Sequence, residues 1–171
     1  TFVLKTRLPE PILEKMIRIT DEIVENRTAK TGGDTPGPGA GQLEDQFWIK
    51  YEILEREEVL DFFLDGCRHF ITQTLCQSQP FNKEAILKEE WLPELTDNMW
   101  INSQKDNEYF PIHTHINCVI SALMLLKIPE YLSSRKSYSN FEEDGAITFT
   151  NNSSTNQFWA SPTMTVLPQV G

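Results

Sequence analysis

The sequence is poor in histidine, cysteine and positive charge. Its 171 residues include three histidines, three cysteines and only 15 lysines and arginines against 25 aspartates and glutamates, which gives a formal net charge of −10. Proteins that bind DNA or RNA carry basic patches that neutralise phosphates, so this balance argues against a nucleic-acid partner. Because Cys67, Cys76 and Cys118 form no CxxC pair, the simplest interpretation is a reduced, intracellular setting.

Long apolar runs are also missing. No stretch approaches the roughly 20 apolar residues that span a bilayer, and no signal peptide opens the chain, so we expect a cytoplasmic protein with no membrane partner. With 39% hydrophobic and 23% charged residues, the composition is ordinary for a globular protein long enough to bury a core. We expect a single domain over 1–171, helical over 1–92 and β-rich over 93–171.

The first half of the sequence has the pattern of helices. Apolar residues recur at helical spacing over 11–26 and 57–76, and "NKEAILKEEW" is typical of a third, shorter helix. The run "TAKTGGDTPGPGAGQ" has almost nothing to bury and predicts a surface loop, with a plain linker favoured over a lid. After it, "DQFWIKY" predicts a short strand.

The second half changes to short β-rich segments separated by turns. These segments are "ELTDNMWINS", "YFPIHTH", "CVISALMLLKI", "GAITFTN" and "TMTVLP". Helices first and strands afterwards predict an α+β domain, in which helices pack on one face of an antiparallel sheet or sandwich. Trp100 is expected in the core of this domain, because large aromatic side chains mostly pack there.

Two of the three histidines, His113 and His115, lie two residues apart in "HTHINC". On a strand they would project from the same face, where two imidazoles can hold iron, zinc or copper. The same spacing also fits two solvated or hydrogen-bonded histidines. A non-haem iron site needs a further carboxylate or imidazole as a ligand. The third histidine, His69, is predicted at the edge of a helix face rather than in a metal site. The candidate carboxylates of the β-rich half, none at a signature spacing, are Asp97, Asp106, Glu108, Glu142, Glu143 and Asp144.

The wider string around this pair resembles a family of 2-oxoglutarate- and iron(II)-dependent oxygenases common in phage and marine bacterial genomes. The shared pattern covers residues 98–151 as Trp-x-Asn, a turn, His-x-His, a serine-containing apolar strand that ends in Pro, and Gly-x-x-x-Phe. The matching residues are Trp100, Asn102, His113, His115, Ser121, Pro129, Gly145 and Phe149. The resemblance implies a double-stranded β-helix, the jelly roll of cupins, with packed N-terminal helices. It also implies iron(II) and 2-oxoglutarate as cofactors and hydroxylation of an unidentified substrate.

The same resemblance implies roles for individual residues. His113 and His115 would be metal ligands, and Asn102 and Ser121 would bind the cosubstrate, while no catalytic side chain is assigned. The alternatives for the last two are that Asn102 caps a strand end and that Ser121 bonds to backbone. If the protein is phage-encoded, the cytoplasm would be that of the host.

Two departures from the family pattern leave other functions open. The family's distal histidine and its arginine would follow Gly171, so we expect the C-terminal strands to be missing and the native chain to continue. In addition, Leu125 stands where the family has a tyrosine that hydrogen-bonds the cosubstrate. One alternative is a non-catalytic jelly-roll protein for binding or structural assembly. Another is a cupin-like zinc or manganese protein that does not use 2-oxoglutarate. The oligomeric state is not predicted.

Overall fold

The computed structural model of the chain describes residues 4–28, 45–88, 99–105, 108–110, 113, 120–128, 146–150 and 163–171. Their contacts divide the chain into two compact units, which are described in turn: Pro11–Ala122, and Thr1–Glu10 together with Leu123–Gly171. Within the described ranges the secondary structure is mixed, with helices and two small antiparallel sheets of two strands each. The single-domain organisation stays a prediction.

The helix predicted over 11–26 is confirmed as α1 (Glu10–Glu25). Its buried side chains recur every three or four residues, as an amphipathic helix requires. They are Leu13, Met16, Ile19, Thr20 and Ile23. Thr20 is the polar member of this face, and its hydroxyl donates to the carbonyl oxygens of Met16 and Ile17, both at 2.9 Å. These bonds offset the cost of burying the hydroxyl.

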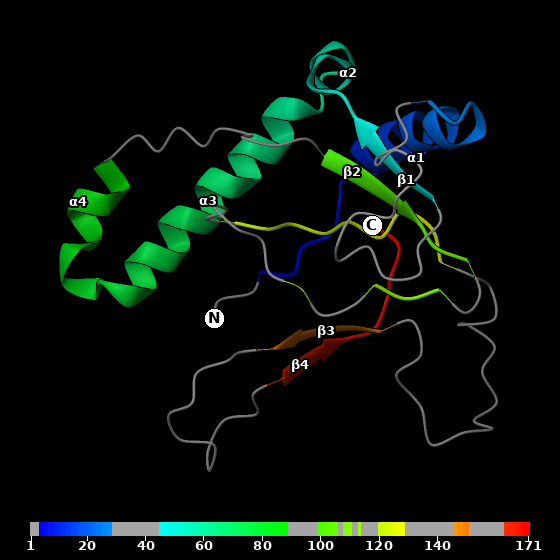
Figure 1. Cartoon of the computed structure of the whole chain (residues 1–171). Helices are drawn as coiled ribbons and strands as arrows, with labels where there is room; N and C mark the ends of the chain where they lie inside the picture. The colour runs from blue at the N-terminus through cyan, green and yellow to red at the C-terminus, as the bar shows by residue number, and fades with distance from the viewer. Residues whose placement is uncertain are drawn as a thin grey trace. The chain divides into compact units, whose positions relative to one another are not determined.

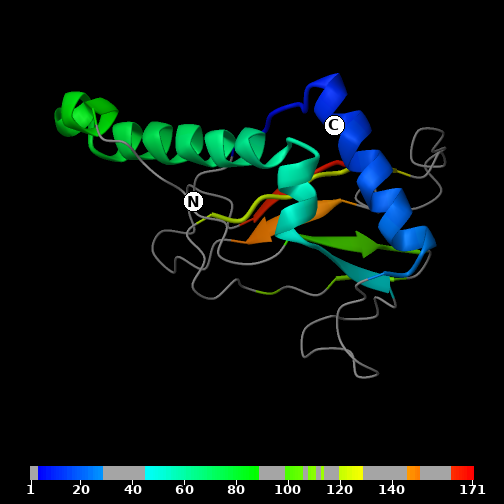
Figure 2. The same cartoon turned by 90° about the horizontal axis from the view of Figure 1, so that it is seen from above.

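Two strands far apart in the sequence form the sheet of the larger unit. β1 (Asp45–Ile49), the strand predicted in "DQFWIKY", pairs antiparallel with β2 (Met99–Ser103). Phe47 and Ile49 are buried, and Trp48 between them is exposed, so one face of the sheet points into the core. α1 lies beside this sheet in both views (Figures 1 and 2).

Between these strands, the described residues 50–88 are mostly helical. The elements are α2 (Tyr51–Arg56), α3 (Leu60–Ser78), the short 3-10 helix η1 (Pro80–Asn82) and α4 (Lys83–Lys88). The helices predicted over 57–76 and in "NKEAILKEEW" are confirmed as α3 and α4, whereas α2 was not predicted. Leu54 and Val59, at the junction of α2 and α3, are fully buried, but along α3 only Leu60 is buried. Both views show α3 extending away from the sheet, with α4 at its far end (Figures 1 and 2).

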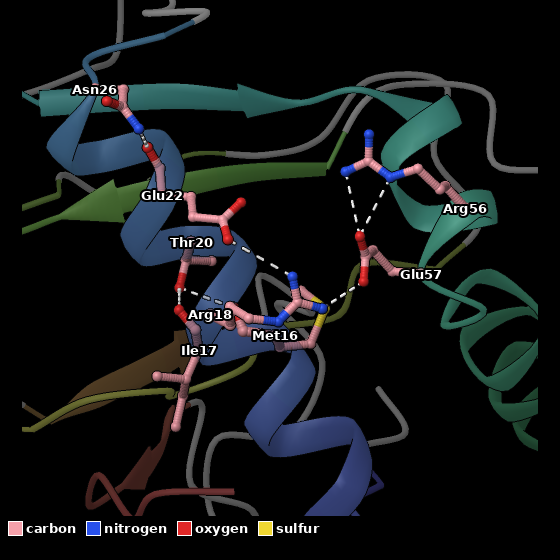
Figure 3. A network of polar contacts seen from close by, with 8 residues as sticks. All are labelled: Met16, Ile17, Arg18, Thr20, Glu22, Asn26, Arg56 and Glu57. Carbon is pink, nitrogen blue, oxygen red and sulfur yellow. Dashed lines mark hydrogen bonds and ion pairs between the residues drawn. The ribbon is translucent and has the colours of Figure 1, made fainter.

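Ion pairs join α1 to the junction of α2 and α3 (Figure 3). The Arg18 guanidinium donates to the Glu57 carboxylate, which also accepts from Arg56 at 3.2 Å. Lys15 Nζ donates to the backbone carbonyl of Glu57 at 2.8 Å. The hydrogen bond from Arg18 is the main reason why the pKa of Glu57 lies below its ordinary value, and the same bond raises the pKa of Arg18. This pairing fixes α1 against the helical segment.

The smaller unit contains a β-hairpin. β3 (Ile147–Thr150) and β4 (Thr163–Val166) pair antiparallel, which confirms the strands predicted in "GAITFTN" and "TMTVLP". The strand predicted in "CVISALMLLKI" is wrong for residues 120–128, which have irregular backbone. No double-stranded β-helix is seen in the ranges that the structure describes, and that fold stays a prediction. None of the helices in those ranges combines the length and the apolar character that crossing a membrane requires.

Candidate functional site

One of the two expected metal ligands lies within the described residues. His113 is exposed, and its ring meets the ring of Phe110 edge-on, with centroids 4.3 Å apart and an interplanar angle of 90°. His113 itself is not in a strand, so the strand face that was expected to present both imidazoles is not seen at this residue. His115 lies outside the described residues. The pairing of the two imidazoles therefore stays a prediction.

A complete metal site does not form from the described part of the chain alone. No group of three or more histidine, cysteine, aspartate or glutamate side chains lies together there. Of the candidate carboxylates, Glu108 is described, and it accepts a hydrogen bond from the backbone N–H of Lys105 at 2.6 Å. The other five lie outside the described residues. His69 is exposed on α3. Of the two imidazoles expected to hold iron, the described part of the chain therefore contains that of His113.

Asn102, the first expected cosubstrate ligand, lies on the exposed face of β2. It is opposite Gln46 on β1, and the Gln46 amide Nε2 donates to Asn102 Oδ1 at 2.8 Å. Because its oxygen is occupied by this bond, Asn102 offers its amide hydrogens to a ligand. The side chain therefore bonds across the sheet rather than capping a strand end. The second expected ligand, Ser121, is exposed in the irregular stretch 120–128.

Trp100 lies on the same exposed face as Asn102, and the expectation that it belongs to the core is wrong. Its side chain is 37% exposed, as is that of Trp48 directly across the sheet. The two indoles meet edge-to-face, with centroids 6.2 Å apart and planes at 83°. Residues two apart on a strand share a face, so Trp100 lies on the same exposed side of the sheet as Asn102. The outer face, defined by Gln46, Trp48, Trp100 and Asn102, thus combines two aromatic rings with two amides.

Sequence reasoning missed Gln46 and Trp48 as parts of this face. The signal available was the alternation in "DQFWI" and "MWINS", in which polar or indole side chains occupy every second position. That alternation indicates two half-exposed strands. It does not reveal that Gln46 pairs with Asn102 and Trp48 with Trp100, because the register depends on contacts between distant segments.

A buried carboxylate stabilises one end of this sheet. Asp45, 5% exposed, bonds to Arg27 just after α1 at 2.8 Å and to Lys105 just after β2 at 3.1 Å. Burial by itself would raise the pKa of Asp45, but hydrogen bonds from Lys105 and Arg27 outweigh it, so the pKa lies below its ordinary value. The Asp45 carboxylate thereby joins α1, β1 and β2 close to Asn102.

Leu125, at the position of the expected tyrosine, is half-buried. Its backbone carbonyl accepts a hydrogen bond from the N–H of Gly171 at 3.1 Å. The leucine side chain has no donor, so it cannot provide the hydrogen bond that the family tyrosine would give to a cosubstrate.

Comparison with known proteins does not extend this description. The chain matches no protein-family model, and neither curated proteins nor solved structures give a match. The resemblance of residues 98–151 to oxygenases stays a prediction that rests on the motif residues.

Proposed function

We propose that this protein is a 2-oxoglutarate- and iron(II)-dependent oxygenase with a jelly-roll domain, which hydroxylates a substrate still to be identified. The observation that carries the proposal is the ordered set of motifs over residues 98–151, in which Trp-x-Asn precedes His-x-His. The exposed amide of Asn102 supports it, because this amide faces outward where a ligand can reach it. When bound, iron and 2-oxoglutarate would supply the oxidising chemistry, and the protein would hold and orient them.

The proposal gives each residue a definite task. His113 and His115 hold the metal through the ring nitrogens of their imidazoles. Asn102 donates its amide hydrogens to a carboxylate of the cosubstrate, and Gln46 keeps the oxygen of that amide turned away. Ser121 provides a second hydrogen bond to the cosubstrate. The net charge of −10 favours a substrate other than nucleic acid, and the proposed location is the cytoplasm.

A non-catalytic jelly-roll protein is the second candidate, and Leu125 is the observation that favours it. Replacing a hydrogen-bond donor by an aliphatic side chain removes a contact to the cosubstrate without disturbing an apolar segment. Such a protein would keep the fold for binding or assembly and would not turn over 2-oxoglutarate.

Metal uptake tests the proposed ligands. Purified protein is loaded anaerobically with iron(II), and bound metal is measured for the wild type, for the double variant His113→Ala/His115→Ala and for the control His69→Ala. His69 is exposed on α3, so its removal should leave uptake unchanged. We expect the double variant to lose the metal. Equal metal content in all three proteins would contradict the proposal.

Succinate formation then separates the two candidates. Iron-loaded protein is incubated with 2-oxoglutarate and oxygen, and succinate is quantified with and without candidate substrates. An oxygenase forms succinate, and the double variant should not. Metal uptake without any succinate would favour the non-catalytic protein.

A further inference from the structure

A surface hollow of about 520 Å³ lies in the smaller unit, between the N-terminal stretch and the last residues. It is lined by Lys5, Thr6, Arg7, Gln169, Val170 and Gly171. Two hydrogen bonds stabilise its walls: Lys5 Nζ donates to Gln169 Oε1 at 2.8 Å, and the N–H of Gly171 donates to the carbonyl of Leu125. The volume is within the range of roughly 300–1,000 Å³ that is common for small-ligand sites.

The charged side chains that the structure describes in this lining are positive, whereas the protein is negative overall. The chain has a net charge of −10, yet the described residues of the lining include two cationic side chains, Lys5 and Arg7, and no aspartate or glutamate. Arg7 has no carboxylate partner among the described residues, and Lys5 is held by a neutral amide. The other described arginines all pair with carboxylates, and they are Arg18, Arg27, Arg56 and Arg68. Arg7 is therefore the described arginine whose charge is left for a ligand.

We propose that this hollow binds a small oxyanion, a carboxylate or a phosphate group, through Arg7 and Lys5. A guanidinium presents a planar fork of donors that matches two oxygens of either group, and an ammonium adds a second positive charge. Gln169 contributes as well: its oxygen accepts from Lys5, so its amide hydrogens remain for the anion. Thr6 also lines the hollow, and its hydroxyl is a further hydrogen-bond donor. This site requires no iron, and none of its residues is among the proposed metal ligands.

Metal-free titration tests the site. Isothermal calorimetry is run at low ionic strength with 2-oxoglutarate and, separately, with inorganic phosphate, on the wild type, Arg7→Gln, Lys5→Gln and the double variant. Removing one charge-assisted hydrogen bond should weaken binding about tenfold. The control is Lys50→Gln/Lys88→Gln, which removes two exposed positive charges outside the hollow. We expect the control to bind like the wild type, and added salt to weaken binding in both.

The binding of the two anions decides whether the proposal holds. Equal binding of the two anions supports recognition of a single oxyanion group, and tighter binding of 2-oxoglutarate supports a site for a dicarboxylate. A wild type that binds neither anion, or a double variant Lys5→Gln/Arg7→Gln that binds like the control, overturns the proposal. Iron uptake measured on the same double variant should be unchanged, so failure of the anion site is distinguishable from failure of the oxygenase proposal.

Discussion

Replacing Asp45 by asparagine probes the interaction that joins α1, β1 and β2. The change keeps the size of the side chain and removes the charge that Arg27 and Lys105 approach at 2.8 and 3.1 Å. The side chain of Asp45 is 7% exposed, whereas the side chains of Arg27 and Lys105 are 57% and 55% exposed. Solvent therefore screens each ion pair from one side only. We expect Asp45→Asn to lower the free energy of unfolding by about 2 kcal/mol. This is more than the roughly 0–1 kcal/mol that a surface ion pair contributes and less than the roughly 3–5 kcal/mol lost when a fully buried ion pair is broken.

The effect should depend on pH in a defined direction. The pKa of Asp45 is lower in the folded protein than in the unfolded chain, so the ionised carboxylate stabilises the fold. That stabilisation is complete above the unfolded value of about 4 and is lost as the pH falls through the folded pKa. The difference between the wild type and Asp45→Asn should therefore be largest at neutral pH and shrink in acid.

Urea and thermal unfolding at pH 7 and pH 3 measure this difference. For a chain of this size, about 2 kcal/mol corresponds to a fall of roughly 4–8 °C in Tm. The control is Asp65→Asn on α3, because Asp65 is 68% exposed and pairs with Arg68 on the surface. It should change stability by less than about 0.5 kcal/mol. An Asp45→Asn protein as stable as this control at pH 7, or a stability gap that persists undiminished at pH 3, would refute the reasoning.

Three further changes have expected outcomes. Met16→Ala empties a fully buried position on α1 and should lower the free energy of unfolding by about 2–5 kcal/mol in urea titrations; a loss below 1 kcal/mol would mean that this face is not packed. A double-mutant cycle of Trp48→Ala and Trp100→Ala should give a coupling of roughly 0.5–1 kcal/mol from their edge-to-face contact, and additive effects would speak against the pairing. Glu57→Gln should destabilise the protein at pH 7 more than at pH 3, since its bond to Arg18 lowers the pKa of Glu57; the reverse order in chemical denaturation would exclude that bond.

The sequence predicted the elements whose periodicity is strong. The apolar face of α1 and the long apolar repeat of α3 were identified within a few residues of their bounds, because the recurrence of apolar residues at every third or fourth position can be read from local sequence alone. The six-residue helix α2 was missed, since "YEILER" alone has too few turns to show a period, whereas the equally short α4 lies within the longer helical pattern "NKEAILKEEW". Residues 120–128 carry an apolar run that suggests a strand, but a strand also needs a partner, and no local pattern reveals one.

The candidate site was predicted less completely, for a related reason. Asn102 was singled out by its motif, but its partner Gln46 belongs to a strand that precedes the helical segment in the sequence. Trp100 was assigned to the core from its size, although the position of a strand residue on the inner or outer face follows from parity with its neighbours. Asp45 and Arg27 flank the Gly- and Pro-rich run, and their ion pair could not be inferred from the composition of that run.

The pairing of β1 with β2 has a consequence for how the protein folds. Ile49 and Met99 are directly opposite each other, so the sheet can form only after a loop of about 50 residues has closed. Closing such a loop costs roughly 3–4 kcal/mol of chain entropy, which is not repaid until the strands meet. The helices inside the loop depend on local contacts and can form earlier. We therefore expect the amides of β1 and β2 to acquire protection from hydrogen exchange late in refolding, after those of α3.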